Sequence, residues 1–144
     1  MRVITGTARG RRLKELKGED TRPTTDRVKE GIFNIIQFDI EGRRVLDLFG
    51  GTGQLGIECL SRGAESATFA DARSDATRLI RENLEHTGLA DRAAVLTADY
   101  ATVLSAGQEK YDLVFLDPPY QTKLLERSLE LISQFDILRE HGII

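Results

Sequence analysis

Residues 44–56, "RVLDLFGGTGQLG", join an apolar run to a glycine-rich turn. The apolar run Arg43–Leu48 predicts a buried strand, and a helical pattern of apolar residues follows from Gln54 to Arg62. The turn carries a G-x-G-x-x-G pattern made by Gly51, Gly53 and Gly56. A strand that turns through such a loop into a helix is typical of α/β folds that bind nucleotides. The glycine pattern alone fits an NAD-type dinucleotide site equally well.

Strands and helices alternate through the rest of the chain. The expected elements, in chain order, are a helix at Thr25–Phe38, the strand Arg43–Leu48, a helix at Gln54–Arg62, a strand at Ser66–Ala70, a helix at Asp75–Thr87, a strand at Ala93–Ala98, a short helix at Thr102–Ala106, a strand at Tyr111–Leu116 and a helix at Thr122–Phe135. This repetition predicts a doubly wound, mainly parallel sheet of Rossmann-like type, with ligands bound just after the strands end. "HGII" at 141–144 predicts the start of a further strand, and we expect the last C-terminal strands to be missing from the chain.

Composition indicates an ordinary globular protein, since 40% of the 144 residues are hydrophobic and 30% are charged. The single cysteine, Cys59, excludes an internal disulfide, and the two histidines leave no set of ligands with zinc-site spacing. No metal is therefore expected. We found no apolar stretch with the length of a signal peptide or a membrane span, which predicts a soluble, cytoplasmic protein with no membrane partner.

The N-terminal segment is basic although the whole chain has a net charge of −3. Residues 1–17 carry +5, which leaves −8 for the remainder. A short hairpin is expected here, with Val3–Ile4 and Leu13–Leu16 joined by "ARGR". We therefore divide the chain into a basic hairpin arm at 1–20 and a Rossmann-like domain at 21–144. Such an arm suits a polyanion such as RNA, and from charge alone a solvated surface hairpin is an equal alternative.

Acidic side chains follow three predicted strands, where a ligand of this fold would lie. Asp47 is near the end of the first predicted strand, just before the loop. Asp71 follows the second strand, where a carboxylate can hold ribose hydroxyls. Asp99 after the third strand can accept from an adenine amino group, and Tyr100 can pack on the ring. Asp47 would repel a pyrophosphate and favour a cationic group, which predicts S-adenosylmethionine as the cofactor. Taken singly, each acid fits a helix-terminal anion or loop cap better than a ligand-binding role.

The fourth predicted strand ends in "DPPY", residues 117–120. Prolines fix φ and donate no N–H, so this tetrapeptide leaves the sheet as a stiff corner. The Asp117 carboxylate and the Pro118 carbonyl can each accept one hydrogen of a planar amine, with Pro119 holding the direction of that carbonyl. Tyr120 can stack on a base. The simpler alternative is a strand terminated by prolines beside an incidental tyrosine.

The order of "DLFGGTG", an acid at 71 and "DPPY" resembles the class I S-adenosylmethionine-dependent amino-methyltransferases. "RVITGTARGRRL" at 2–13 and "RPTTDRVKEGIFNII" at 22–36 resemble more closely the bacterial 16S ribosomal RNA guanine-N2 methyltransferase family. The resemblance covers essentially all 144 residues. One departure is Gly-Gly-Thr-Gly, where that family often has Ala-Gly-Ser-Gly.

The resemblance implies methyl transfer to the N2 amine of a guanine in 16S ribosomal RNA, either free or in a small-subunit assembly intermediate. We expect the enzyme to be a monomer. It assigns the catalytic corner to Asp117, Pro118, Pro119 and Tyr120. It assigns the cofactor site to Asp47, Phe49, Gly51, Gly53, Asp71, Asp99 and Tyr100. Contacts to the RNA are assigned to Arg9, Arg11, Arg12, Arg22 and Arg27.

Two other classes of protein share part of this pattern. DNA adenine-N6 or cytosine-N4 methyltransferases have the same corner, and a non-catalytic dinucleotide-binding module would have the same glycine loop. The corner by itself indicates only that an amine on a planar group is methylated. Outside the site, we assign Val28, Ile32, Ile35 and Ile36 to the core, and Asn83 and Cys59 to structural positions.

Overall fold

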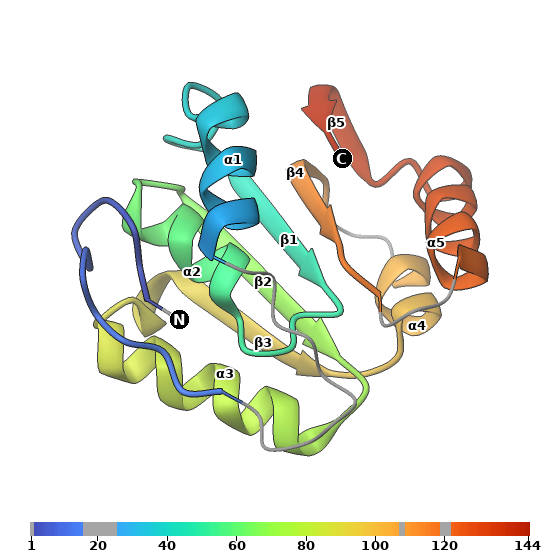
Figure 1. Cartoon of the computed structure of the whole chain (residues 1–144). Helices are drawn as coiled ribbons and strands as arrows, with labels where there is room; N and C mark the ends of the chain where they lie inside the picture. Colours follow the sequence, from blue (N-terminus) through green and yellow to red (C-terminus); the bar gives the residue numbers. More distant parts are fainter. Residues whose placement is uncertain (1, 16–25, 107–108, 119–121) are drawn as a thin grey trace.

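A parallel sheet of five strands runs through the centre of the protein, in the order β3-β2-β1-β4-β5 (Figure 1). The computed structural model describes residues 2–15, 26–106, 109–118 and 122–144. The strands are β1 (Arg44–Leu48), β2 (Ser66–Asp71), β3 (Ala93–Thr97), β4 (Tyr111–Leu116) and β5 (Leu138–Ile143). The helices are α1 (Asp26–Ile36), α2 (Gln54–Ser61), α3 (Ser74–Thr87), α4 (Tyr100–Ser105) and α5 (Thr122–Gln134), with a short 3-10 turn at Ala90–Arg92.

The order in which successive strands are placed in the sheet reverses between β3 and β4. It builds outward from β1 to β2 and β3, then returns to place β4 on the other side of β1. Leu48 of β1 is in register with Ala70 of β2 and Leu116 of β4, so these three strands end side by side. Parallel sheets bind ligands at this reversal, beyond the carboxyl ends of the strands.

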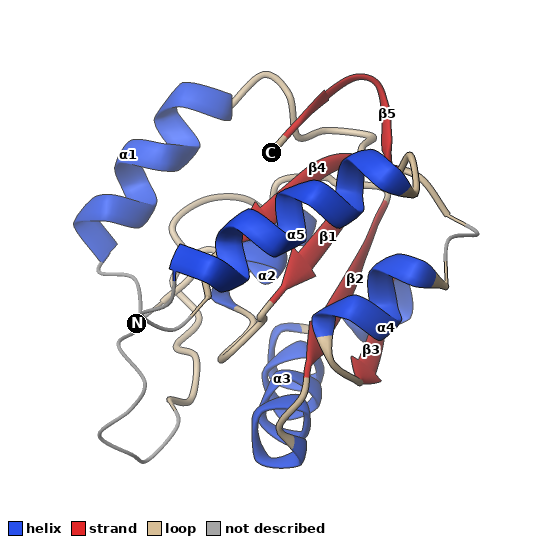
Figure 2. Ribbon diagram, turned by 90° about the vertical axis from the view of Figure 1, so that its right-hand side faces the viewer, coloured by secondary structure: helices blue, strands red, loops and turns tan. Residues whose placement is uncertain are grey.

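Helices cover both faces of the sheet. One apolar cluster joins α1, α2 and α3 to strand residues such as Val45 and Phe69, and a second joins α4 and α5 to Leu46 and Val114. Figure 2 shows α4 and α5 together on one side of the sheet. Successive side chains of β1 point to opposite faces of the sheet, so Val45 packs in the first cluster and Leu46 and Leu48 pack in the second. β1 is therefore buried on both faces, as is typical of a central parallel strand.

The predicted doubly wound parallel sheet is confirmed, and the predicted elements match the observed ones to within about two residues at most boundaries. The predicted further strand is present and pairs in parallel with β4, but its start was misplaced: β5 begins at Leu138, residues 141–143 form its end, and Ile144 lies outside it. The boundary proposed near residue 20 lies outside the described residues, so the division into arm and domain stays a prediction. None of the described helices is long and apolar enough to cross a membrane.

The assignment of Val28 and Ile35 to the core is wrong. Val28 is 53% exposed and Ile35 is 82% exposed, whereas Ile36 is buried. The inward stripe of α1 is made by Lys29, Phe33 and Ile36, which are spaced by four and three residues. Residues 28 and 35 are therefore turned away from the sheet.

The N-terminal arm lies against α2 and α3 (Figure 1). Its two halves meet in one antiparallel bridge, between Arg2 and Arg12. The expected hairpin is thus present as a single bridge instead of two strands within residues 2–15, while Leu16 lies outside the described part of the chain. Several arm N–H groups are used on the body of the protein instead, because Ile4 and Thr5 donate to Glu58 and Ala8 donates to Ser61.

Candidate functional site

Asp47 is the buried acid of the site. It stands one residue before the end of β1, is 1% exposed, and accepts a hydrogen bond from Gly56 N at 3.1 Å. This bond supplies an acceptor to the first turn of α2, whose N-cap residue, Gly53, offers none. Burial raises the pKa of Asp47 to about 8, the Gly56 N–H opposes that rise, and the charges of Asp117 and Asp71 add to it. The alternative of a carboxyl at a helix terminus is therefore observed in position, and a cationic neighbour would favour the ionised form of this buried group.

The glycine loop is fastened to the end of β2 by Asp71. One carboxylate oxygen of Asp71 accepts from Gly51 N at 3.2 Å, and the other accepts from Arg73 N at 2.9 Å. Gly51 has a φ of 59° and Gly53 a φ of 82°, a region that favours glycine. A Cβ on Gly51 would meet no atom closer than 4.0 Å, so its outer side is open to a ligand. The role of Asp71 toward ribose hydroxyls stays a prediction.

The end of β3 supplies Asp99 and Tyr100. Asp99 is exposed and caps α4, because its Oδ1 accepts from Thr102 N at 2.8 Å. Tyr100 packs against Phe49, with ring centroids 5.7 Å apart and planes inclined by 35°. This contact joins the end of β3 to the end of β1 and forms an aromatic wall beside the glycine loop. The roles of these three residues toward an adenine ring stay predictions.

The corner after β4 is described only at Asp117 and Pro118. Asp117 is exposed, and its negative charge adds a smaller part to the rise that burial causes in the pKa of Asp47. β4 pairs directly with β1, so the corner begins next to the buried acid. Pro119 and Tyr120 lie outside the described residues, and so does Arg22.

The remaining arginines assigned to RNA are exposed. These residues are Arg9, Arg11, Arg12 and Arg27. Their side chains make no hydrogen bond or ion pair with the residues that the structure describes. Arg2 shares this property. Three of the predicted arginines lie on the arm, and Arg27 lies in the first turn of α1. These guanidinium groups are therefore available to an external anion.

A buried cluster of charges holds the arm, and sequence reasoning missed it. Glu58 of α2 is fully buried, forms ion pairs with Lys29 at 3.2 Å and Arg62 at 2.9 Å, and accepts from Ile4 N at 2.8 Å and Thr5 N at 3.0 Å. Lys29 also donates to Arg2 O at 3.1 Å. The available signal was an acid in the otherwise apolar helix "QLGIECLS", where a lone charge needs partners.

Asn83 links the arm to the glycine loop. This fully buried residue of α3 donates to Lys14 O at 3.1 Å and to Thr52 O at 2.9 Å, and it accepts from Lys14 N at 2.8 Å. The structural assignment of Asn83 is confirmed, and so is that of Cys59, which is buried in the core. What the sequence did not reveal is that Asn83 connects two parts of the candidate site.

Among the described residues, no three His, Cys, Asp or Glu side chains are grouped so as to hold a metal ion. The site therefore consists of acids, glycines and aromatic rings at the ends of β1, β2, β3 and β4. A docked basic arm is linked to it through Asn83.

The protein family described as Conserved hypothetical protein 95 matches residues 1–144. Ribosomal RNA small subunit methyltransferase D of Haemophilus influenzae is 35% identical over 147 residues, which cover all of this chain and 76% of the relative. The enzyme of that name from Escherichia coli K12 is 35% identical over 144 residues and is covered to 72%. This chain belongs to their family.

Solved structures of similar proteins agree with this membership of the family. The structure of yhhF from Escherichia coli aligns with a TM-score of 0.87 and 36% identity, covering 96% of this chain and 75% of that one. A Thermus thermophilus protein, TTHA0928, aligns with a TM-score of 0.82 and 27% identity, covering 96% and 80%. The methyltransferase type of Rossmann-like fold is thereby confirmed.

Proposed function

We propose that this protein transfers a methyl group from S-adenosylmethionine to the exocyclic N2 amine of a guanine in 16S ribosomal RNA. The observation that carries the proposal is the position of Asp47, Asp71 and Asp117 at the adjacent ends of β1, β2 and β4, beside an open glycine loop. Three acids at one sheet edge disfavour a diphosphate and favour a cationic nucleoside. Membership of a family with ribosomal RNA methyltransferases supports RNA as the methyl acceptor.

The residues of the site suit this cofactor. The open side of Gly51 and the Phe49–Tyr100 wall accept the adenosine, with Asp71 on the ribose and Asp99 on the adenine amino group. The buried Asp47 carboxylate faces the ammonium group of the methionine tail, and a cation there lowers its pKa from about 8 and keeps it ionised. When bound, the cofactor supplies an electrophilic methyl group on a sulfonium.

The corner after β4 orients the acceptor amine. An exocyclic amine is a poor nucleophile because its lone pair is delocalised into the base. The Asp117 carboxylate and the Pro118 carbonyl each accept one amine hydrogen, which turns the lone pair toward the methyl group. Tyr120 stacks on the base, and a base–aromatic contact of this kind contributes about 1–3 kcal/mol to the free energy of binding. Positioning of the two reactants lowers the barrier by about 7–11 kcal/mol.

Methyl transfer leaves a positive charge on the acceptor nitrogen, next to the Asp117 carboxylate as its electrostatic partner, and the nitrogen then loses a proton to water. A guanine inside a helix cannot reach the corner, so the target base is unstacked from its neighbours before reaction. The arm arginines Arg9, Arg11 and Arg12 hold the RNA backbone, and Arg22 and Arg27 hold phosphates nearer the cofactor. In the cytoplasm, the protein acts as a monomer on free 16S RNA or on a small-subunit assembly intermediate.

The test is transfer of labelled methyl from S-adenosylmethionine to three acceptors: unmodified small-subunit RNA, unmodified large-subunit RNA and duplex DNA. We expect label in the small-subunit RNA alone. Label in DNA would select a DNA amino-methyltransferase instead. Binding of NAD by calorimetry, with no signal for S-adenosylmethionine, would select a dinucleotide-binding module.

A further inference from the structure

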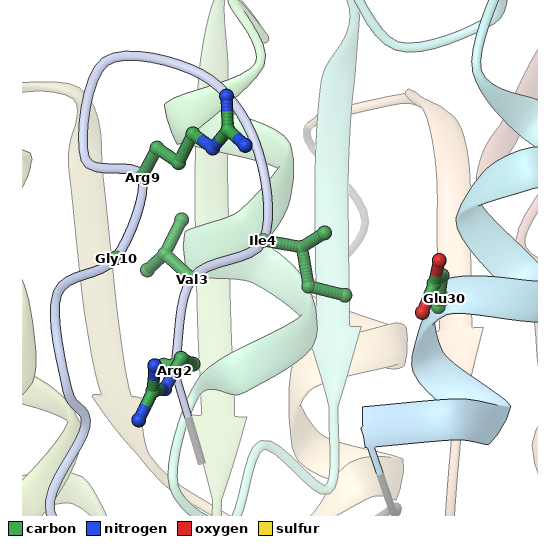
Figure 3. Close-up of a pocket in the computed structure, with 6 residues that line it drawn as sticks. All are labelled: Arg2, Val3, Ile4, Arg9, Gly10 and Glu30. Atoms are coloured by element: carbon green, nitrogen blue, oxygen red, sulfur yellow. The ribbon is translucent and has the colours of Figure 1, made fainter.

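A hollow of about 320 Å³ lies between the arm and α1, and its lining includes none of the cofactor-site residues at the strand ends (Figure 3). Five arm residues and one helix residue line it, namely Arg2, Val3, Ile4, Arg9, Gly10 and Glu30. Its size is at the lower end of the range for pockets that hold small organic molecules. Its lining combines an apolar floor with charges of both signs.

The floor of the hollow is fixed to the body of the protein. Val3 is buried and Ile4 is half-buried. The buried Glu58 accepts the Ile4 N–H, and Lys29 donates to the Arg2 carbonyl. A Cβ on Gly10 would meet no atom within 4 Å, so the backbone there leaves open space. An apolar, rigid floor of this kind suits the flat face of a nucleobase.

The charged side chains around the hollow have no ion-pair partner among the described residues. The side chains of Arg2, Arg9 and Glu30 are exposed and form no ion pair or hydrogen bond with a described residue. In Figure 3, Arg2 and Arg9 extend from the arm, and Glu30 extends from α1 on the opposite side. Two guanidinium groups suit a phosphate, whereas a carboxylate accepts from base amino groups.

We propose that this hollow binds one nucleotide of the RNA substrate other than the methylated guanine. Its phosphate lies on Arg2 and Arg9, its base lies over Ile4 and the open backbone at Gly10, and a base amino group donates to Glu30. The inference rests on the proposed function for its RNA ligand, and it adds a position at which sequence is read. Cytosine, adenine and guanine each carry an amino group from which Glu30 can accept, which favours these three bases over uracil at this position.

Glu30 separates this inference from simple attraction between a basic arm and RNA. A carboxylate within an RNA-binding surface repels phosphates, so if it contacts no base, its removal strengthens binding of every RNA. If Glu30 accepts from a base, its removal leaves that amino group unpaired and weakens binding of the cognate RNA. The two ideas therefore predict opposite signs for the same substitution.

The experiment measures dissociation constants of wild type, Glu30→Ala and Glu126→Ala for a small-subunit RNA fragment and for an unrelated RNA of equal length. Glu126 is an exposed acid of α5 with no described partner, which makes its substitution a matched control for charge. We expect Glu30→Ala to weaken binding of the small-subunit fragment about tenfold. Glu30→Ala should bind the unrelated RNA slightly more tightly than wild type does. Glu126→Ala should bind both RNAs slightly more tightly.

A second pair of variants tests the phosphate contacts. Arg2→Ala and Arg9→Ala should weaken binding of both RNAs and each reduce the salt slope of binding by about one. Tighter binding of the small-subunit fragment by Glu30→Ala would overturn the inference and leave the proposed function intact. No preference of the wild-type protein for small-subunit RNA would overturn both. Cofactor affinity serves as the folding control and should be unchanged in all four variants.

Discussion

Gly6 is the position where the docking of the arm is most sensitive to one added carbon. Its φ is 93°, and a Cβ built on it would overlap the carbonyl carbon and oxygen of Ser61 and lie 2.7 Å from Ser61 Oγ. Two of these are backbone atoms of α2, which cannot turn aside. Gly6→Ala therefore forces the arm away from α2.

The cost follows from the hydrogen bonds that residues 5–8 make with Ser61. Thr7 N donates to Ser61 O at 2.9 Å, Ala8 N donates to Ser61 Oγ at 3.0 Å, and Ser61 Oγ donates to Thr5 O at 2.6 Å. At about 1 kcal/mol each, their loss lowers the free energy of unfolding by about 3 kcal/mol. Backbone strain at positive φ adds about 1–2 kcal/mol.

Gly10→Ala is the matched control, because its φ is 84° and its Cβ would meet open space. It carries a similar strain without the overlap. Urea unfolding should show Gly6→Ala less stable than Gly10→Ala by about 3 kcal/mol, and protease should cut the Gly6→Ala arm faster. Equal stability and equal protease resistance of the two variants would refute the account of how the arm is held.

Four further predictions concern the site itself. Asp47→Asn keeps the acceptor for Gly56 N and removes a buried acid whose pKa is raised to about 8; calorimetry should show lost affinity for S-adenosylmethionine with the folded protein preserved. In wild type, the same affinity should rise from pH 6 to pH 8 as Asp47 ionises, and Asp47→Asn should flatten that rise, whereas an unchanged slope would contradict it. Asp117→Asn should lower the methyl-transfer rate about a hundredfold with cofactor affinity retained, and near-full turnover would remove Asp117 from its role. Asn83→Ala breaks the link between Lys14 and Thr52 and should weaken both cofactor and RNA binding; an effect on thermal stability alone would make Asn83 purely structural.

Local patterns were enough to locate the ends of the strands. Asp47, Asp71 and Asp99 could be placed at one sheet edge because a parallel α/β sheet brings its carboxyl ends together. The same reasoning gave the turn at Gly51 and Gly53. These features depend on short stretches of sequence and on the handedness of the fold, so one chain suffices to predict them.

Contacts between distant parts of the chain could not be predicted in this way. Apolar residues occur on several sides of α1, and its inward face is decided by Lys29, which is buried only because Glu58 neutralises it. A buried lysine is unfavourable without its partner, so the pattern of apolar residues alone indicated Val28 and Ile35 instead. The docking of the arm depends on the same carboxylate.

The identity of the methylated nucleoside tests the central claim most directly. Small-subunit RNA that lacks this modification would be incubated with the protein and labelled S-adenosylmethionine, digested to nucleosides and separated by chromatography with mass detection. The account predicts label in N2-methylguanosine alone, and about a hundredfold lower initial rate of labelling with Asp117→Asn. Label in a methylated adenosine or cytidine, or in guanosine methylated at another atom, would contradict it.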